Sequence, residues 1–486
     1  MSLKSTSRRN FIKTMGMGST ALFFQNPITQ LIGNPAKQSK PNVLFISIDD
    51  LNDWINCMGG HPGTITPHLD RLAQRGLLFT NAHCPAPLCN ASRTSLFTGI
   101  RPSSSGIYYN NQRWRQALPK AVTIPQHFTA NGYFSAGCGK LFHHGTHAFD
   151  MASWQDYFPD QNKYPGKCMP EHPKHPDWRP GHPVPKGAGF PFGPIDVSDE
   201  EMSDWQVTNW AISQLNKKHE KPFFLACGIY RPHLAWFAPQ KYFDMYPLNE
   251  IKLPNVNEND LDDVPPIAQK WAKPDGDHRK FTSNNLWHRA MQAYQACITF
   301  ADACVGRLID ALDQSSYANN TIIVLWSDHG WHLGEKLHWR KFALWEEATH
   351  NPLMFVAPGV TKAGSTCDKP VSLIDIYPTL IELCELPAIN SQEGVSLLPL
   401  LQDPDKEWER PALTTYGRNN HSIRSQNWRY TRYNDGTEEL YDHKNDQLEW
   451  VNLADDPQYN HIKTDLSKWL PEINAADAPR IKRKKS

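Results

Sequence analysis

Continuous runs of apolar residues recur along the chain and predict the strands of a buried sheet. They cover residues 42–48, 222–228, 321–327 and 352–357. None shows the alternation of apolar and polar positions typical of a half-buried strand, which favours strands that are covered on both faces. Segments with helical spacing lie between them, at 66–78 and 287–312. This alternation predicts the α/β class, with a mostly parallel sheet flanked by helices.

Two stretches depart from this pattern. Residues 150–193 are rich in Pro, Gly, His and Lys, and are interpreted as a long insertion over the site or a surface loop. Residues 424–453 have the pattern of short strands with an Asn-Asp-Gly turn at 434–436, which predicts a small antiparallel sheet. We therefore expect a catalytic α/β domain over 40–385, a smaller α+β subdomain over 386–475, and a basic tail over 476–486 that is disordered at residues 480–485.

The N-terminus carries a pattern typical of twin-arginine (Tat) export. Arg8 and Arg9 are followed by Phe11 and Lys13, and then by a short apolar stretch over residues 15–24. The stretch is too short to span a membrane. Residues 1–39 are accordingly interpreted as an export signal and linker, and the predicted location is periplasmic or secreted, without a membrane span.

Composition narrows the classes of function. The chain has 486 residues, is 40% hydrophobic and has a formal net charge of zero. A large core is therefore available, and a general nucleic-acid or polyanion binder is disfavoured, so anion binding must be local. The ten cysteines form no CxxC pair and are interpreted mostly as buried small apolar residues. Cys89 is the exception.

Acidic residues follow two of the predicted strands. Asp49 and Asp50 come directly after the first run, and Asp328 and His329 after the third. Carboxyl ends of parallel strands meet at one edge of a sheet, where α/β proteins place their sites. Carboxylate oxygens are the ligands that Ca²⁺ prefers, so a shared metal site is one interpretation. Turns and helix N-caps are the other, since single acidic pairs usually serve those purposes.

The segment 87–99 closely resembles the signature of the type I sulfatases, a cysteine followed by Ser-Arg and a downstream Thr-Gly. Four further motifs follow the order of that family's iduronate-2-sulfatase-like branch: Asp49-Asp50, residues 139–143, residues 231–233, and residues 328–331 with Lys341 beyond. The resemblance runs from Pro41 to about Tyr459. It implies an alkaline-phosphatase-like fold. In one departure, Ala91 stands where the family usually has Pro.

The resemblance implies the chemistry of the site. A formylglycine-generating maturation enzyme would oxidise Cys89 to formylglycine (3-oxoalanine), whose hydrate attacks sulfur with one hydroxyl. The second hydroxyl then loses a proton and expels sulfate, which splits one difficult step into two. A calcium ion would polarise a sulfate oxygen. Its implied ligands are Asp49, Asp50, Cys89, Asp328 and His329.

Further roles are implied for residues of the same motifs. Arg93 lies four positions after Cys89, which is the same face if a helix starts there, and by resemblance it would support the nucleophile. Lys140 and Lys341 would bind sulfate oxygens. His143 would take the proton of the hydrate, and His233 would protonate the leaving alcohol.

Trp331 and His332 follow the second metal pair after Gly330 and are predicted to shape the substrate side. The expected substrate is a sulfated sugar of an acidic polysaccharide, either ulvan oligosaccharides or glycosaminoglycans of the iduronate 2-sulfate type. Choline sulfatase and a phosphodiester or phosphonate monoester hydrolase on the same fold are the alternatives. A non-catalytic glycan-binding protein would be expected to have lost the nucleophile, the acids or the lysines, and all are present.

Overall fold

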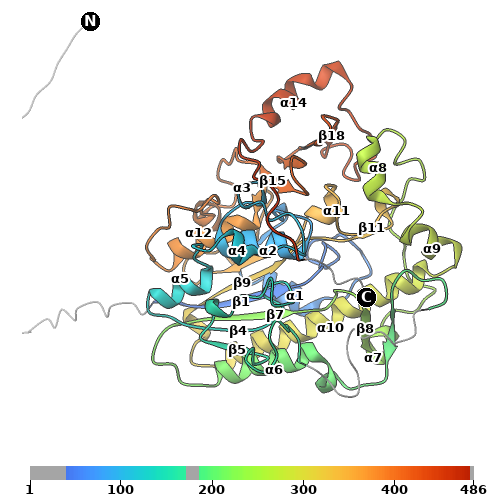
Figure 1. Cartoon of the computed structure of the whole chain (residues 1–486). Helices are drawn as coiled ribbons and strands as arrows, with labels where there is room; N and C mark the ends of the chain where they lie inside the picture. The colour runs from blue at the N-terminus through green and yellow to red at the C-terminus, as the bar shows by residue number, and fades with distance from the viewer. Residues whose placement is uncertain (1–39, 171–184, 482–486) are drawn as a thin grey trace, which may run out of the picture. The chain divides into compact units, whose positions relative to one another are not determined.

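The structure, a computed structural model, describes residues 40–170 and 185–481. Its centre is an eight-stranded sheet in the order β13-β2-β12-β9-β1-β7-β4-β5 (Figure 1). The strands are β1 (Asn42–Ile48), β2 (Leu77–Phe79), β4 (Phe134–Gly139), β5 (Asp156–Phe158), β7 (Phe223–Ile229), β9 (Thr321–Ser327), β12 (Leu353–Val356) and β13 (Ser365–Cys367). Only β12 runs antiparallel to its neighbours. The predicted α/β class and mostly parallel sheet are confirmed.

The sheet is covered on both faces. Leu44 and Ile46 of β1 join one core cluster, and Val43 and Phe45 join the other, because successive side chains of a strand point to opposite faces. The first face packs against α1 (Pro67–Ala73), α6 (Ser203–Leu215) and α10 (Trp287–Gln314). The second packs against α2 (Cys89–Thr98), α5 (Ile124–Ala130) and α12 (Ile376–Leu383) (Figure 1). Burial on both faces explains why the strands read as continuous apolar runs.

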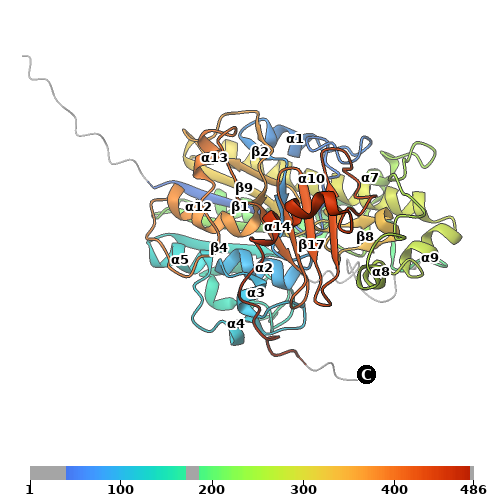
Figure 2. The same cartoon turned by 90° about the horizontal axis from the view of Figure 1, so that it is seen from above.

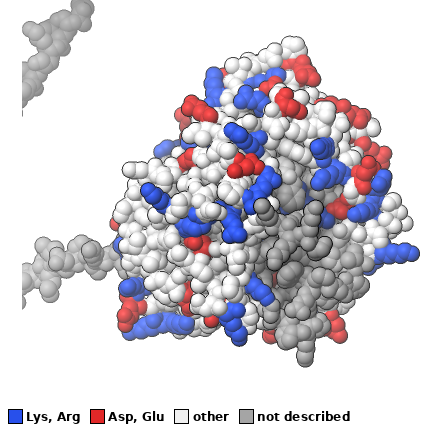
Figure 3. Space-filling view, in the orientation of Figure 1, with Lys and Arg blue, Asp and Glu red and all other residues white. Residues whose placement is uncertain are grey.

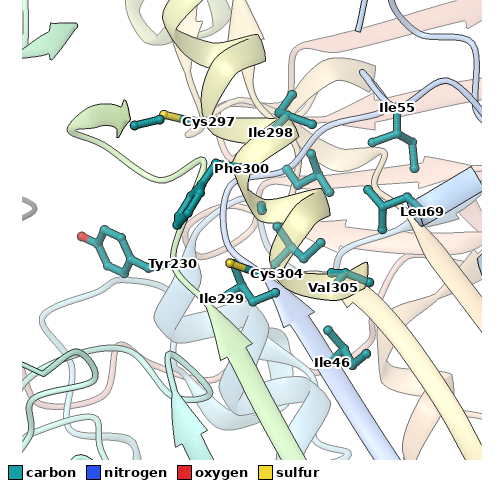
Figure 4. Close-up of a cluster of buried hydrophobic side chains, with 14 of the residues drawn as sticks. Ile46, Ile55, Leu69, Ile229, Tyr230, Cys297, Ile298, Phe300, Cys304 and Val305 are labelled. Atoms are coloured by element: carbon teal, nitrogen blue, oxygen red, sulfur yellow. The ribbon is translucent and has the colours of Figure 1, made fainter. Parts of the chain in front are cut away.

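Helix α10 lies across the central strands. Cys297, Phe300 and Cys304 recur at helical spacing and are fully buried. Figure 4 shows this helix beside β1 and β7, with Ile46 and Ile229 among the side chains of the same cluster. Full burial of a side chain such as Phe300 or Ile46 contributes about 1.5–3 kcal/mol. The helix therefore fixes the two strands whose ends carry the site.

Two segments differ from their predicted structure. The helix expected over 66–78 stops at Ala73, and Leu77 begins β2. At Gly76 a Cβ atom would lie 2.1 Å from the carbonyl oxygen of Phe355, so only glycine allows β2 to start this close to β12. Within the insertion 150–193, β5 extends the sheet edge and β6 (Phe192–Ile195) pairs with β8 (Trp236–Pro239). Its residues 171–184 lie outside the described part.

A four-stranded antiparallel sheet follows the main sheet in sequence. It comprises β15 (Ala412–Thr415), β16 (His421–Arg424), β17 (Trp428–Arg432) and β18 (Glu438–Asp442), with α14 (Asn460–Ser467) packed against it (Figure 2). The predicted small antiparallel sheet and its turn are confirmed, although the sheet begins earlier, at Ala412. The domain division at residue 386 stays a prediction.

The remaining elements are short. They are α3 (Pro102–Ser105), α4 (Trp114–Ala117), α7 (Gln240–Asp244), α8 (Pro266–Ala272), α9 (Asp277–Ser283), α11 (Glu346–Thr349), α13 (Leu398–Gln402), β3 (Ala82–His83), β10 (His332–Leu333), β11 (Trp339–Arg340) and β14 (Val371–Ser372). None of the described helices has both the length and the apolar composition needed to cross a bilayer.

Both chain ends carry predictions that fall largely outside the described residues. The export signal at 1–39 and residues 482–486 of the basic tail lie beyond them. The start of the tail is described, and there Arg480 lies 4.1 Å from the ring centroid of Tyr109. The disorder of the tail stays a prediction.

Candidate active site

Four neighbouring strands deliver polar side chains to one edge of the sheet. In the order β9-β1-β7-β4, all parallel, the residues after each strand include Asp328, Asp49, His233 and Lys140. The register pairs Ile48 of β1 with Ser327 of β9, so the two acidic pairs leave the sheet side by side. This edge is where parallel α/β sheets place their ligands.

The thiol of Cys89 lies at the centre of this edge. Its Sγ is 3.1 Å from Lys341 Nζ, 3.4 Å from His329 Nε2 and 3.7 Å from Lys140 Nζ. Cys89 is fully buried and is the first residue of α2. The N-terminal end of a helix carries partial positive charge, so helix and lysines together favour an anion at this position.

A buried ion-pair network surrounds the thiol. Arg93 donates to Asp49 Oδ1 at 2.9 Å and to Asp328 Oδ2 at 2.8 Å. Lys140 pairs with Asp49, and Lys341 Nζ lies 2.7 Å from Asp50 Oδ1. Three carboxylates thus face three permanent cations, and their charges cancel. The surface face drawn in Figure 3 also carries both acidic and basic side chains, which are interspersed and form no large patch of one sign.

The acids can hold a cation in addition. Ligand atoms of Asp49, Asp50, Cys89, Asp328 and His329 all lie within 4.8 Å of one another. Asp50 Oδ2 is buried and has no hydrogen-bond partner among the described residues. Unsatisfied buried carboxylate oxygens are costly, and a hard divalent ion satisfies them. The donor set therefore fits a metal ion, and such an ion would leave the site positive, which suits an anionic substrate.

The environment separates the pKa values of the three acids. Burial would raise the pKa of Asp49, but Lys140, His233 and Arg93 hold it well below its usual value. Burial dominates at Asp50, whose pKa is raised despite Lys341, and raises the pKa of Asp328 to about 6 despite Arg93. Divergent pKa values in one buried cluster are typical of functional sites.

The two predicted catalytic histidines, His143 and His233, adjoin this network. His233 Nε2 lies 3.7 Å from Asp50 Oδ2, and its Nδ1 lies 2.7 Å from the carbonyl oxygen of Leu234. Burial, followed by the charge of Lys140, lowers the pKa of His233 well below its usual value. Burial and the neighbouring His144 likewise lower the pKa of His143 well below its usual value. The Nδ1 atom of His143 has no hydrogen-bond partner within the described structure. Both imidazoles are therefore neutral in this state.

The two predicted substrate-binding residues lie in different surroundings. The ring of Trp331 lies 5.5 Å from Lys341 Nζ, which places it beside the network. His332 is fully buried and packs against His338 and Trp345, at ring-centroid distances of 4.8 and 6.0 Å. The structure thus brings Trp331 to the site, whereas the ring contacts of His332 are with residues outside the network.

Two residues that support the site are absent from the sequence-based prediction. The ring of Tyr230 lies 4.9 Å from Lys140 Nζ and 4.6 Å from the His233 ring. The hydroxyl of Tyr294 donates to the backbone carbonyl of Asp50 at 2.8 Å. Tyr230 directly precedes the motif at residues 231–233, which could have drawn attention to it. Tyr294 lies inside a long helix, where an aromatic residue at core spacing gives no hint of its polar contact.

Comparison with known proteins identifies the family. A sequence profile of the sulfatases matches residues 41–386, and a profile of the N-sulphoglucosamine sulphohydrolase C-terminal region matches residues 334–476. The chain belongs to the sulfatase family. A sulfatase of Formosa agariphila is 40% identical over 464 residues, which cover 90% of this chain and 87% of that protein. Human iduronate 2-sulfatase is 34% identical over 382 residues, 74% of this chain and 67% of that protein.

The fold extends beyond sulfate chemistry. Phosphonate monoester hydrolase from Silicibacter pomeroyi superposes with a TM-score of 0.74 at 22% identity, over 88% of this chain and 94% of that one. This likeness concerns the fold alone, since fold does not determine function. The sulfatase assignment therefore rests on the sequence relatives, and the expectation of a sulfuric ester hydrolase is confirmed on that basis.

Proposed function

We propose that this sulfatase removes sulfate from a sulfated sugar of an acidic polysaccharide, through a formylglycine made from Cys89 and a bound Ca²⁺. The observation that carries the proposal is the position of Cys89 Sγ, fully buried between two lysines and a carboxylate cluster. Sugar as the substrate class is supported by the likeness to an iduronate 2-sulfatase.

Asp49, Asp50, Asp328 and His329 would hold the calcium ion beside position 89. When present, the metal and the hydrated aldehyde would supply a polarised sulfate oxygen and an attacking hydroxyl. Arg93 would keep Asp49 and Asp328 in place, since it bonds to both.

The two lysines would bind the sulfate group, and the two histidines would transfer protons. Lys140 and Lys341, both within 3.7 Å of Cys89 Sγ, would bind sulfate oxygens and offset the charge that develops on them. Neutral His143 is suited to accept a proton from position 89. His233 is neutral without substrate, and a bound sulfate would raise its pKa so that it can protonate the leaving alcohol.

The substrate class is tested by sulfate release from ulvan and glycosaminoglycan oligosaccharides, choline sulfate and 4-nitrophenyl sulfate, with phenyl phosphonate esters alongside. We expect kcat/KM to be highest on one sulfated oligosaccharide, by at least about 10²-fold over choline sulfate, because remote contacts of the sugar contribute to transition-state binding. A higher kcat/KM on the phosphonate ester would contradict the proposal.

Calcium dependence is tested by chelation. Treatment with EGTA, which prefers Ca²⁺ to Mg²⁺, should abolish sulfate release, and added Ca²⁺ should restore it, because the carboxylates supply oxygen ligands. Asp50→Asn should raise the Ca²⁺ concentration needed for half-maximal activity at least about tenfold. Full activity after chelation, with no calcium found by elemental analysis, would rule out the calcium site.

We also propose that residues 1–39 direct export to the periplasm or beyond. The support is the Arg8-Arg9 pair with Phe11, Lys13 and the short apolar stretch behind it. Replacing both arginines by lysine should retain the protein in the cytoplasmic fraction of a bacterial host. An unchanged distribution between the cell fractions would contradict Tat export.

A further inference from the structure

Asp50 has a left-handed backbone conformation, with a φ of 58°. Residues other than glycine rarely adopt this region, although Asp tolerates it better than most. In this conformation Asp50 Oδ1 lies 2.7 Å from Lys341 Nζ and 3.4 Å from His329 Nε2. Such a backbone conformation persists only where neighbouring contacts hold it. The contacts of the turn at residues 50–52 therefore decide where this carboxylate lies.

Tyr294 of α10 makes two hydrogen bonds to this turn. Its hydroxyl donates to the backbone carbonyl of Asp50 at 2.8 Å and accepts from the backbone N–H of Asn52 at 3.2 Å. Among the described residues, neither of these two backbone groups has another hydrogen bond. Asp50 and Asn52 are both buried, and buried backbone groups without a partner are costly. The hydroxyl therefore stabilises the turn in the conformation that gives Asp50 its orientation.

The position of the Tyr294 hydroxyl is itself fixed by packing. The side chain is fully buried, and its ring lies against Trp54 and Trp236, at ring-centroid distances of 5.8 and 5.1 Å. Tyr294 also belongs to the core cluster in which α10 packs on the central strands. A hydroxyl on a closely packed ring has little freedom to move, so Tyr294 ties Asp50 to the rigid core.

The other contacts of the turn lead to the segment after β9. The Asn52 side-chain amide donates to the backbone carbonyl of Trp331 at 3.1 Å. The backbone N–H of Asp50 donates to Asp328 Oδ1 at 3.2 Å, and this oxygen belongs to another proposed metal ligand. The hydrogen bond from Tyr294 is thus a contact of Asp50 that does not depend on the ligands themselves.

We propose that Tyr294 is a positioning residue for calcium binding, whose hydroxyl holds Asp50 so that its carboxylate faces the site before the ion arrives. The inference rests on the proposed function, since it takes the calcium site beside Cys89 as given. Tyr294 would act through Asp50, because its hydroxyl bonds to backbone atoms of the turn. A ligand that is already in place binds an ion more tightly, because less order has to be gained on binding.

The test is calorimetric titration of Ca²⁺ into the full chain after removal of bound metal with EGTA. Tyr294→Phe removes the hydroxyl and keeps the ring, and it should raise the Kd for Ca²⁺ about tenfold. Tyr246→Phe is the matched control, since Tyr246 is also buried and its hydroxyl accepts from the backbone N–H of Ile65 at 2.9 Å and bonds to Thr299 of the same helix. This control should lose similar stability and keep the Kd of the parent protein.

Two further readouts separate positioning from a general structural role. Asp50→Gly removes the carboxylate and permits the left-handed conformation, so adding Tyr294→Phe to it should change the Kd by less than about twofold. At saturating Ca²⁺, the kcat of Tyr294→Phe for 4-nitrophenyl sulfate should return to within about twofold of the parent value, because only the affinity for the ion is impaired.

An unchanged Kd for Ca²⁺ in Tyr294→Phe would overturn the inference. So would a rise in Kd that Tyr246→Phe shares, a rise that is equally large in the Asp50→Gly background, or a kcat that stays low at saturating Ca²⁺. Each of these results would leave the proposed calcium site standing. A parent protein that binds no Ca²⁺ would instead contradict that site, and this inference with it.

Discussion

Cys89→Ala should reduce sulfate release by at least about 10⁴-fold while leaving the fold intact. Removing the nucleophile of a covalent mechanism costs this much because the remaining contacts only bind and polarise the substrate. The side chain is small and fully buried, so its truncation leaves a small cavity and a stability cost of about 1 kcal/mol. Initial rates with 4-nitrophenyl sulfate and thermal unfolding together measure the two effects.

Cys84→Ala is the matched control. Cys84 is also fully buried, but its thiol lies 3.7 Å from the carbonyl oxygen of Ala348 and does not belong to the carboxylate cluster. The Cys84→Ala variant should lose about as much stability as Cys89→Ala and should keep its sulfatase activity. Activity lost equally in both variants would show that packing, and not a nucleophile at position 89, explains the effect.

Cys89→Ser separates formylglycine from a simple hydroxyl nucleophile. A serine hydroxyl can take up sulfate but has no second hydroxyl to expel it, so the variant should become sulfated once and stop. Mass spectrometry of the peptide around position 89 should show one added sulfo group in the variant and formylglycine in the native chain. An unmodified thiol in active native protein would contradict the maturation of Cys89.

The sequence was sufficient to predict the strands that carry the site. Residues 42–48 and 321–327 are apolar throughout because both faces of the sheet are covered, and the acids that follow must lie at one edge. The proximity of Asp49 and Asp328 follows from parallel pairing alone. Cys89 was predicted from a local motif, and the helix that starts there places Arg93 one turn further on, as its spacing implied.

Contacts that do not follow from the pairing of the main strands could not be predicted from the sequence. Lys341 reaches Asp50 across 291 positions, and no local pattern encodes that pairing. His332 directly follows Trp331 in sequence but begins the short strand β10, and its ring packs against His338 and Trp345 instead of Lys341.

Arg429→Met should lower the free energy of unfolding by about 3–5 kcal/mol, the usual cost of removing one partner from a buried ion pair. The Arg429 side chain is fully buried and bonds to Glu449 Oε1 at 2.5 Å, to Glu346, and to the carbonyl oxygen of Leu344 at 3.1 Å. It thereby joins β17 to the segment that follows Lys341. The variant should also lose activity, because that lysine is less firmly placed. Urea unfolding and initial rates measure both effects.

The loss of stability in Arg429→Met should become smaller as the pH falls. Burial would raise the pKa of Glu346, but Arg424 and Arg429 hold it well below its usual value of 4.5. A carboxyl group with a lowered pKa stabilises the fold above its unfolded pKa, and this contribution is lost as the pH falls through the folded pKa. Without Arg429 the contribution of Glu346 to stability is smaller. The difference in the free energy of unfolding between the parent protein and Arg429→Met should therefore be largest at pH 7 and should decrease below about pH 5.

Arg432→Met is the matched control, since Arg432 lies on the same strand but is exposed, and it should change stability by less than about 0.5 kcal/mol. If the deficit of Arg429→Met were constant between pH 4 and pH 8, the ion pairs would not be its source. Lost packing of the buried side chain would then account for it. A deficit that narrows in acid would instead show that the C-terminal sheet is held to the Lys341 segment by charge, so that the smaller sheet helps to build the active site.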